Sequence, residues 1–142
     1  MWWFLKIIIY ISNMIKQETK GIVVGVEVEY LPHQSDSMLF NYVFMYSILI
    51  ENKSNDIVKL MRRKWEILDS NGEKRTVEGE GVVGEQPVIL PNEKYTYSSG
   101  CNLATDFGCM KGEYVLKNIT KDGLEFKVTI PEFKLITPFK LN

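Results

Sequence analysis

Apolar and polar residues alternate with a period of two along most of the chain after Gly21. Val24, Val26 and Val28, for example, are separated by one glycine and one glutamate. Successive side chains of a β-strand point to opposite faces, so this alternation predicts strands with one buried and one exposed face. The predicted strands cover residues 22–30, 40–50, 57–68, 74–78, 95–99, 114–118 and 124–130.

The stretch 40–50 has the strongest apolar face and is predicted to be the central core strand, because large aromatic and branched residues fit a buried sheet surface. Its apolar side carries Phe40, Tyr42, Phe44, Tyr46, Ile48 and Ile50.

Turn-forming residues separate the predicted strands. Asn71-Gly72 and Asp122-Gly123 both indicate hairpins, and Asn-Gly tolerates the positive φ angles of a type I′ turn. Pro131 is expected to end the last strand, because proline has no N–H to donate to the sheet. No stretch after Gly21 has a sustained helical period.

About seven short strands within roughly 120 residues predict an all-β fold, an immunoglobulin-like or fibronectin type III-like β-sandwich. A small closed barrel is the alternative that the pattern leaves open, although strands with one apolar face suit two packed sheets. A length of 142 residues fits one ordinary domain. Residues 14–142 contain no repeat or linker, so we expect them to form a single domain.

Residues 1–13 differ in kind from the rest of the chain. They begin with the apolar run MWWFLKIIIYI, which is shorter than the ~18 apolar residues expected of a membrane-spanning helix. The run lacks the basic stretch and the cleavage signal of a secretory leader. Met14 opens an ordinary polar sequence, so we interpret residues 1–13 as the product of an upstream start codon. The alternative is an interfacial anchor, or an added strand or helix on the sandwich.

The charge balance argues against two classes of partner. Seventeen basic and eighteen acidic residues give a net charge of -1. This balance supplies no general attraction to nucleic acid or to an anionic membrane, so neither is predicted as a partner.

Few residues of the catalytic and metal-binding types are present. Cys101 and Cys109 are too few for a disulfide framework or a zinc ligand set, which indicates a reduced, cytoplasmic protein. His33 is the only histidine, so a Ser-His-Asp mechanism would need that one residue to meet a nucleophile in space. We therefore predict no enzymatic activity, no catalytic residues, no metal and no cofactor.

Residues 79–84, GEGVVG, match the dinucleotide-binding pattern G-x-G-x-x-G. That motif requires a helix after the glycines, and the following Glu-Gln-Pro and the extended stretch 88–90 exclude one. A glycine loop can instead cradle phosphate on its backbone amides, here at Gly79, Gly81 and Gly84, assisted by Arg75 or Arg63. Three neighbouring glutamates oppose an anion. The favoured interpretation is that the glycines permit turns or close backbone approach.

A basic cluster stands at Lys59, Arg62, Arg63 and Lys64. On a strand these side chains divide between two faces, so a solvated face is favoured over a phosphate or partner patch.

Several segments in a fixed order resemble the bacterial ApaG family, over nearly all of residues 21–135. They are residues 30–35 (YLPHQS), 63–65 (RKW), 69–72 (DSNG), 79–87 (GEGVVGEQP), 91–93 (PNE), 97–101 (YSSGC), 108–114 (GCMKGEY) and 126–133 (FKVTIPEF). One departure is Lys64, where the family often has histidine.

The resemblance implies a fibronectin type III-like sandwich with no established enzymatic activity. Related eukaryotic domains are attached to an F-box protein and to a polymerase-interacting protein, which favours partner recognition. In the family the glycine motif has been suggested to bind pyrophosphate. Family members have also been linked to cobalt and magnesium resistance, and to the gene neighbourhood of a diadenosine tetraphosphate hydrolase.

Three functional hypotheses follow from the sequence. The first is a non-catalytic module that binds a protein partner through exposed loops, including 79–87 and 98–106. The second is binding of pyrophosphate or a dinucleoside polyphosphate on the glycine loop, which Gly81→Val should abolish. The third is handling of cobalt or a similar metal by Cys101, Cys109 and His33. Exposed edge strands are also expected to allow a homodimer.

Overall fold

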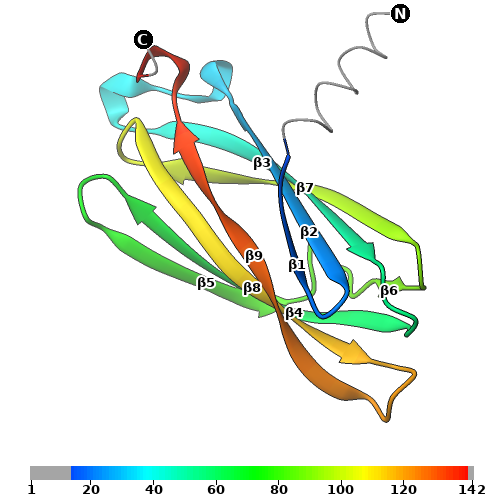
Figure 1. Cartoon of the computed structure of the whole chain (residues 1–142). Helices are drawn as coiled ribbons and strands as arrows, with labels where there is room; N and C mark the ends of the chain where they lie inside the picture. Colours follow the sequence, from blue (N-terminus) through cyan, green and yellow to red (C-terminus); the bar gives the residue numbers. More distant parts are fainter. Residues whose placement is uncertain (1–13, 141–142) are drawn as a thin grey trace, which may run out of the picture.

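The computed structural model describes residues 14–140, which form nine strands and three single-turn 3-10 helices (Figure 1). The strands are β1 (Ile15–Thr19), β2 (Ile22–Tyr30), β3 (Tyr42–Asn52), β4 (Val58–Asp69), β5 (Lys74–Glu80), β6 (Val88–Ile89), β7 (Lys94–Leu103), β8 (Phe107–Asn118) and β9 (Leu124–Ile136). The helical turns are η1 (Pro32–Gln34), η2 (Ser37–Leu39) and η3 (Pro138–Lys140). The interpretation of residues 1–13 concerns a segment outside the described residues.

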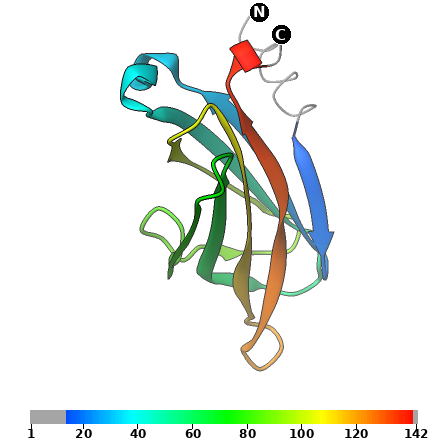
Figure 2. The same ribbon diagram turned by 90° about the vertical axis from the view of Figure 1, so that its left-hand side faces the viewer.

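The strands form two antiparallel sheets packed face to face, which confirms the predicted β-sandwich (Figures 1 and 2). One sheet has the order β1-β2-β3-β7. The other has the order β5-β4-β8-β9, with β6 paired to β4. No helix within residues 14–140 is long and apolar enough to cross a membrane.

The strand β1 was not predicted. Four of its five residues are exposed, so its sequence carries no apolar face. It is held instead by backbone pairing with β2, from Ile15 opposite Val26 to Thr19 opposite Ile22. Pairing of this kind depends on the backbone, which explains why the alternation of side chains did not reveal it.

The core is built from the predicted apolar faces. Phe44, Tyr46, Ile48 and Ile50 of β3 are all buried, as expected for the central strand. Phe40 is a correction, because it lies outside β3 and is 71% exposed. Residues 36 and 41 pair with each other and close a loop before the strand begins, and Phe40 lies in that loop with a left-handed backbone.

Pro131 does not end the last strand. The strand β9 continues to Ile136, and the register between β8 and β9 shifts between Met110 and Gly112. The shift leaves Pro131 and the next residue opposite Lys111 alone, which is the geometry of a β-bulge. A bulge does not require every N–H, so a proline is tolerated there.

One of the two predicted hairpin turns differs from its expected geometry. In the turn after β4 only Gly72 has a positive φ, of 91°, and Asp69 and Glu73 are joined by a backbone hydrogen bond. The connection is therefore a three-residue loop and not a two-residue type I′ turn. At the other hairpin, Asp122 and Gly123 both have positive φ angles, as that turn type requires.

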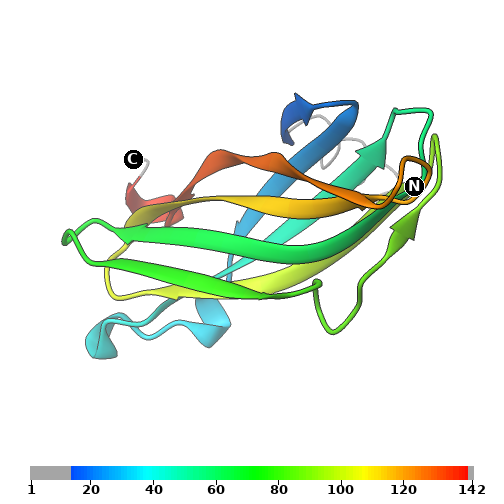
Figure 3. The same cartoon turned by 90° about the horizontal axis from the view of Figure 1, so that it is seen from below.

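The sandwich is closed along one side and open along the other. On the closed side β9 packs against β1 and β2. On the open side the edge strands β5 and β7 belong to different sheets and run along the same side of the molecule (Figure 3). Residues 98–103, predicted to be a loop, belong to β7, and Gly79 belongs to β5. The candidate site lies between these two edge strands.

Candidate functional site

The glycine segment folds as a small hairpin beyond the end of β5. The backbone groups of Val82 and Glu85 exchange two hydrogen bonds of 2.8 and 3.0 Å. Val83 and Gly84 between them have φ angles of 48° and 78°, which makes a two-residue type I′ turn. The side chain of Val82 is completely buried and anchors the hairpin to the core.

Of the three motif glycines, Gly81 is required by a close backbone contact, Gly84 has a left-handed φ of 78°, and Gly79 meets only the end of a flexible side chain. A Cβ on Gly81, whose φ is 61°, would lie 2.1 Å from the carbonyl oxygen of Glu85. A Cβ on Gly79 would lie 2.8 Å from the guanidinium of Arg63. A Cβ on Gly84 would meet nothing within 4 Å. The conformation of the hairpin therefore accounts for Gly81 and Gly84 without a ligand.

The backbone amides of the hairpin are largely engaged. The N–H of Gly81 donates to Met61 at 2.8 Å, and the amides of Val82 and Glu85 bond each other's carbonyls. Only the amides of Val83 and Gly84 remain for an anion. The prediction of pyrophosphate binding at this loop thus depends on two amides, and it stays a prediction.

The structure brings Arg63 to the glycine segment but does not bring Arg75 there. Nη1 of Arg63 donates to the carbonyl oxygens of Glu80 and Gly81, at 3.0 and 2.8 Å. The Arg75 guanidinium instead reaches across to β7, where it donates to the carbonyl and side-chain oxygens of Asn102 and contacts Cys101 Sγ. The two arginines therefore have different immediate neighbours.

Both arginines nevertheless line one cleft on the open side of the sandwich. The cleft has a volume of about 200 Å³. Its walls come from β3, β4, β5, β7 and β8 and consist of Tyr46, Arg63, Trp65, Ile67, Arg75, Val77, Ser99, Gly100, Cys101, Asn102 and Met110. The sequence indicated both arginines as candidate ligand-binding residues, but it did not indicate the other residues of the cleft wall. Those residues come from five strands spread along the sequence.

A group of buried tyrosines lies behind Arg63. The hydroxyls of Tyr97 and Tyr114 are hydrogen-bonded to each other, and that of Tyr46 is bonded to Ser99. Burial raises the pKa of all three phenols above the ordinary value, and the positive charge of Arg63 partly offsets this. The phenols are therefore neutral donors and acceptors at physiological pH.

We expect four of the seven tyrosines to resist ionisation in the folded protein. Desolvation raises their pKa values above 10.0, whereas unfolding returns them to that value. Their contribution to stability is thus complete below about pH 10 and is lost as the pH rises through the folded-state pKa values. Tyrosinate absorbance followed against pH, in buffer and in guanidinium chloride, measures this. Identical titration curves in the two solvents would contradict it.

The basic cluster of β4 divides between two faces, as expected. Arg63 faces the interior, while Arg62 pairs with Glu125 at 2.5 Å and Lys64 with Glu78 at 3.8 Å. Lys64, the residue that departs from the family pattern, therefore lies outside the cleft that Arg63 and Trp65 line.

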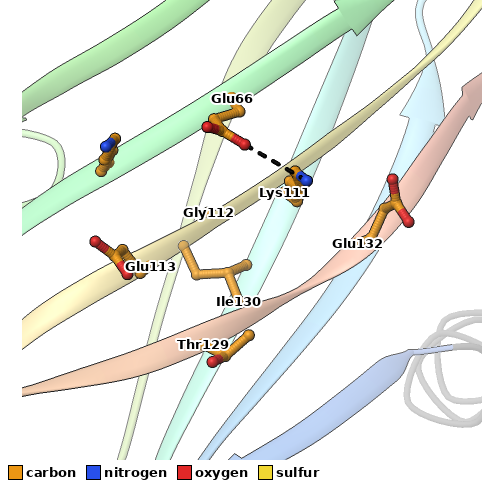
Figure 4. Close-up of a pocket in the computed structure, with 8 residues that line it drawn as sticks. Glu66, Lys111, Gly112, Glu113, Thr129, Ile130 and Glu132 are labelled. Atoms are coloured by element: carbon orange, nitrogen blue, oxygen red, sulfur yellow. Dashed lines mark ion pairs between the residues drawn. The ribbon is translucent and has the colours of Figure 1, made fainter.

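Lys64 also borders a hollow of about 320 Å³ on the outer sheet face (Figure 4). Glu66, Glu113 and Glu132 line this hollow together with Lys111. Glu66 pairs with Lys111 at 3.6 Å, and Glu113 pairs with Lys127 at 3.4 Å. Its charges are largely balanced within the protein.

The residues of the metal hypothesis lie apart in the fold. Cys101 is buried on β7 of one sheet, and Cys109 is half-buried on β8 of the other. Burial raises the pKa of both thiols, which disfavours the thiolate form that binds metal. His33 lies in the exposed turn η1. Within residues 14–140 no three cysteine, histidine or acidic side chains converge on a common point.

An exposed apolar turn that the sequence did not indicate lies at one end of the sandwich. Met38, Leu39 and Phe40 are 85%, 75% and 71% exposed. Hydrogen bonds nevertheless hold the backbone of this turn. Asp36 accepts a hydrogen bond from the N–H of Met38 at 3.0 Å, and Ser35 bonds both Leu31 and Val43 at 2.8 Å. We call residues 37–40 the apolar turn.

Comparison with known proteins finds one consistent family. A family model described as "ApaG domain" matches residues 32–118. "Protein ApaG" of Brucella canis is 47% identical over 120 residues, covering 84% of this chain and 91% of the relative. "Protein ApaG" of Vibrio campbellii is 47% identical over 121 residues, covering 85% and 94%. The crystal structure of the putative ApaA protein from Bordetella pertussis superposes with a TM-score of 0.79 at 38% identity, covering 82% and 94%.

Proposed function

This chain belongs to the ApaG domain family, and on that premise we propose that it is a non-catalytic module that binds a partner protein through the apolar turn. The observation that carries the proposal is the exposure of Met38, Leu39 and Phe40 side by side in an ordered loop. Loops on a rigid sheet scaffold are where binding function is commonly found.

The apolar turn has the properties of a preformed binding element. Hydrogen bonds from Ser35 and Asp36 fix its backbone, so little conformational entropy is lost when a partner binds. Phe40 has φ 52° and ψ 47°, a left-handed conformation that costs a residue with a side chain about 1–2 kcal/mol. That conformation displays the ring to solvent. Burying three large apolar side chains in a partner would contribute a much larger favourable free energy than this conformational cost.

The expected partner is a protein with an apolar groove. Methionine and aromatic side chains are enriched at the cores of protein interfaces. The sequence named two other segments as binding loops. Most of 98–106 belongs to β7, and 79–87 displays a single large apolar residue at its tip, Val83, which is 63% exposed. The apolar turn is therefore the better candidate for the centre of an interface.

We expect Phe40→Gly to weaken partner binding at least tenfold without destabilising the fold. The substitution removes an interface ring, and glycine adopts the left-handed backbone freely. Proteins retained by the immobilised wild-type chain and lost from the variant are identified first. The affinity of each purified partner is then measured by calorimetry, and stability is measured by urea unfolding.

Leu124→Ser is the matched control. Leu124 is 68% exposed and is the first residue of β9. It follows the β8–β9 turn, which lies at the opposite end of the molecule from the apolar turn (Figures 1 and 2). We expect this variant to bind like the wild type. A purified partner that binds Phe40→Gly and wild type equally would refute the assignment of the interface. If the retained protein is the chain itself, the partner is a second copy.

A further inference from the structure

The cleft on the open side contains two positive charges that are held in place but not neutralised. Arg63 is bound by the carbonyl oxygens of Glu80 and Gly81, and Arg75 by the oxygens of Asn102. These acceptors are neutral, so they orient each guanidinium without pairing its charge. Eight ion pairs join other basic residues of the described chain to carboxylates, and neither arginine belongs to one of them.

The same cleft contains a buried hydrogen-bond donor without a partner. Trp65 lines the cleft and is 2% exposed, and its indole N–H finds no acceptor among residues 14–140. The nitrogen itself has almost no accessible surface, so a ligand in the cleft does not reach it. The indole nevertheless lies beside the cleft, which makes its N–H signal a reporter of binding there.

The lining of the cleft is selective for an anion. It contains two guanidinium groups, the hydroxyls of Tyr46 and Ser99 and no carboxylate. Its volume of about 200 Å³ is below the roughly 300–1,000 Å³ of pockets that enclose drug-sized ligands. It therefore suits a group of a few heavy atoms with several acceptor oxygens.

We propose that this cleft binds the phosphate groups of a small phosphorylated molecule, through Arg63 and Arg75. Guanidinium groups bind phosphate through two parallel hydrogen bonds, which favours arginine over lysine in such sites. Asp69 and Glu73 line an adjoining hollow beside Arg75, and Glu78 and Glu80 line a second hollow that Arg63 also borders. We therefore place the phosphate between the two arginines, in the cleft itself, whose lining has no carboxylate. This site differs from the glycine hairpin, since it uses side chains and not the amides of Val83 and Gly84.

The burial of Cys101 and the raised pKa of its thiol bear on the kind of binding. A protonated, buried thiol is a poor nucleophile. Binding is therefore expected to be reversible, with no covalent step.

The test is a titration of the full 142-residue chain with inorganic pyrophosphate, followed by NMR. The indole N–H of Trp65 is the reporter, assigned from the signal that disappears in Trp65→Phe. We expect a saturable shift of this signal. Calorimetry should show an affinity loss of about tenfold or more for Arg63→Gln and for Arg75→Gln. Trp65→Phe keeps an aromatic ring in the core and serves to assign the signal.

Arg62→Gln is the matched control, because it removes the same charge from the neighbouring residue on the outer face. Its affinity should equal that of the wild type. If Arg63→Gln fails to fold, Arg75→Gln decides the question. The absence of a saturable shift at millimolar pyrophosphate would overturn the proposal, as would equal losses in Arg62→Gln and Arg75→Gln.

Titrations with two further ligands, acetate and ADP, test which chemical group the cleft binds and which kind of molecule carries that group. Acetate tests whether any carboxylate suffices, and binding as strong as that of pyrophosphate would overturn the assignment to phosphate. ADP tests whether the diphosphate is recognised as a free ion or as part of a nucleotide. Whichever of pyrophosphate and ADP binds more tightly identifies the kind of molecule that the cleft prefers. Shifts confined to the amides of Val83 and Gly84 would place the anion at the hairpin and overturn the cleft site.

Discussion

Gly81→Ala is expected to lower the free energy of unfolding by about 3–4 kcal/mol. Two costs add at this position. The φ of 61° is unfavourable for a residue with a side chain, and the new Cβ would lie 2.1 Å from the carbonyl oxygen of Glu85. Relieving that contact requires the hairpin to open, which breaks the Val82–Glu85 pairing and displaces the buried side chain of Val82. Urea unfolding of the variant and the wild type measures the difference.

Gly84→Ala separates the two costs. Its φ of 78° is also left-handed, but its Cβ would meet nothing within 4 Å. We expect a loss of only about 1 kcal/mol, from the backbone conformation alone. Equal effects of the two substitutions would show that the contact with Glu85 is unimportant.

This comparison changes the meaning of the Gly81→Val experiment suggested by the sequence. Valine at this position would disrupt the hairpin whether or not the hairpin binds pyrophosphate. Lost binding in that variant would therefore not identify the loop as the site. The amide signals of Val83 and Gly84 in the wild-type chain answer the question directly.

Asn52→Ala is expected to cost about 3 kcal/mol of stability. Asn52 is completely buried, and its side chain makes four hydrogen bonds within the loops at one end of the sandwich. Its amide donates to the carbonyls of Asp56 and Ile89 at 2.8 and 3.0 Å, and its carbonyl accepts from the N–H and hydroxyl of Ser54. Truncation leaves these groups without their buried partner.

Asn55→Ala is the control for this prediction. Asn55 lies three residues further along the same turn and is exposed. We expect its substitution to change stability by less than about 0.5 kcal/mol. Thermal and urea unfolding of both variants measure the difference. A small effect of Asn52→Ala would mean that water replaces the lost hydrogen bonds and that the site is less enclosed than its burial indicates.

Local sequence patterns predicted much of the fold because they depend on which side chains of a strand are buried. The alternation in β2 and β3 reports which side chains avoid water, and those faces form the core. Strand β1 escaped prediction because pairing with β2, and not an apolar face, holds it. Pro131 was misread because its strand continues through a bulge that depends on the register of β8.

The residues of the site were predicted less well than the fold. Arg75 was named because it lies near the glycine motif in the sequence, and Arg63 was named from the basic cluster 59–64. Arg63 does contact the glycine segment, but Arg75 contacts Asn102 on the opposite sheet. Phe40 was assigned to the core because it continues the apolar alternation of β3, yet the loop closed by residues 36 and 41 turns it outward.

Side-chain periodicity and local motifs were enough to predict that this chain is all-β, that its strands have one buried face, and that it resembles the ApaG family. These properties need no knowledge of distant contacts. Which strands become neighbours across the two sheets could be read only from the folded molecule. That arrangement places Arg63, Trp65 and Arg75 in one cleft with Ser99, and it exposes the apolar turn. Side chains from five strands meet there because two sheets pack face to face, and pairings between distant residues are not encoded in any local pattern.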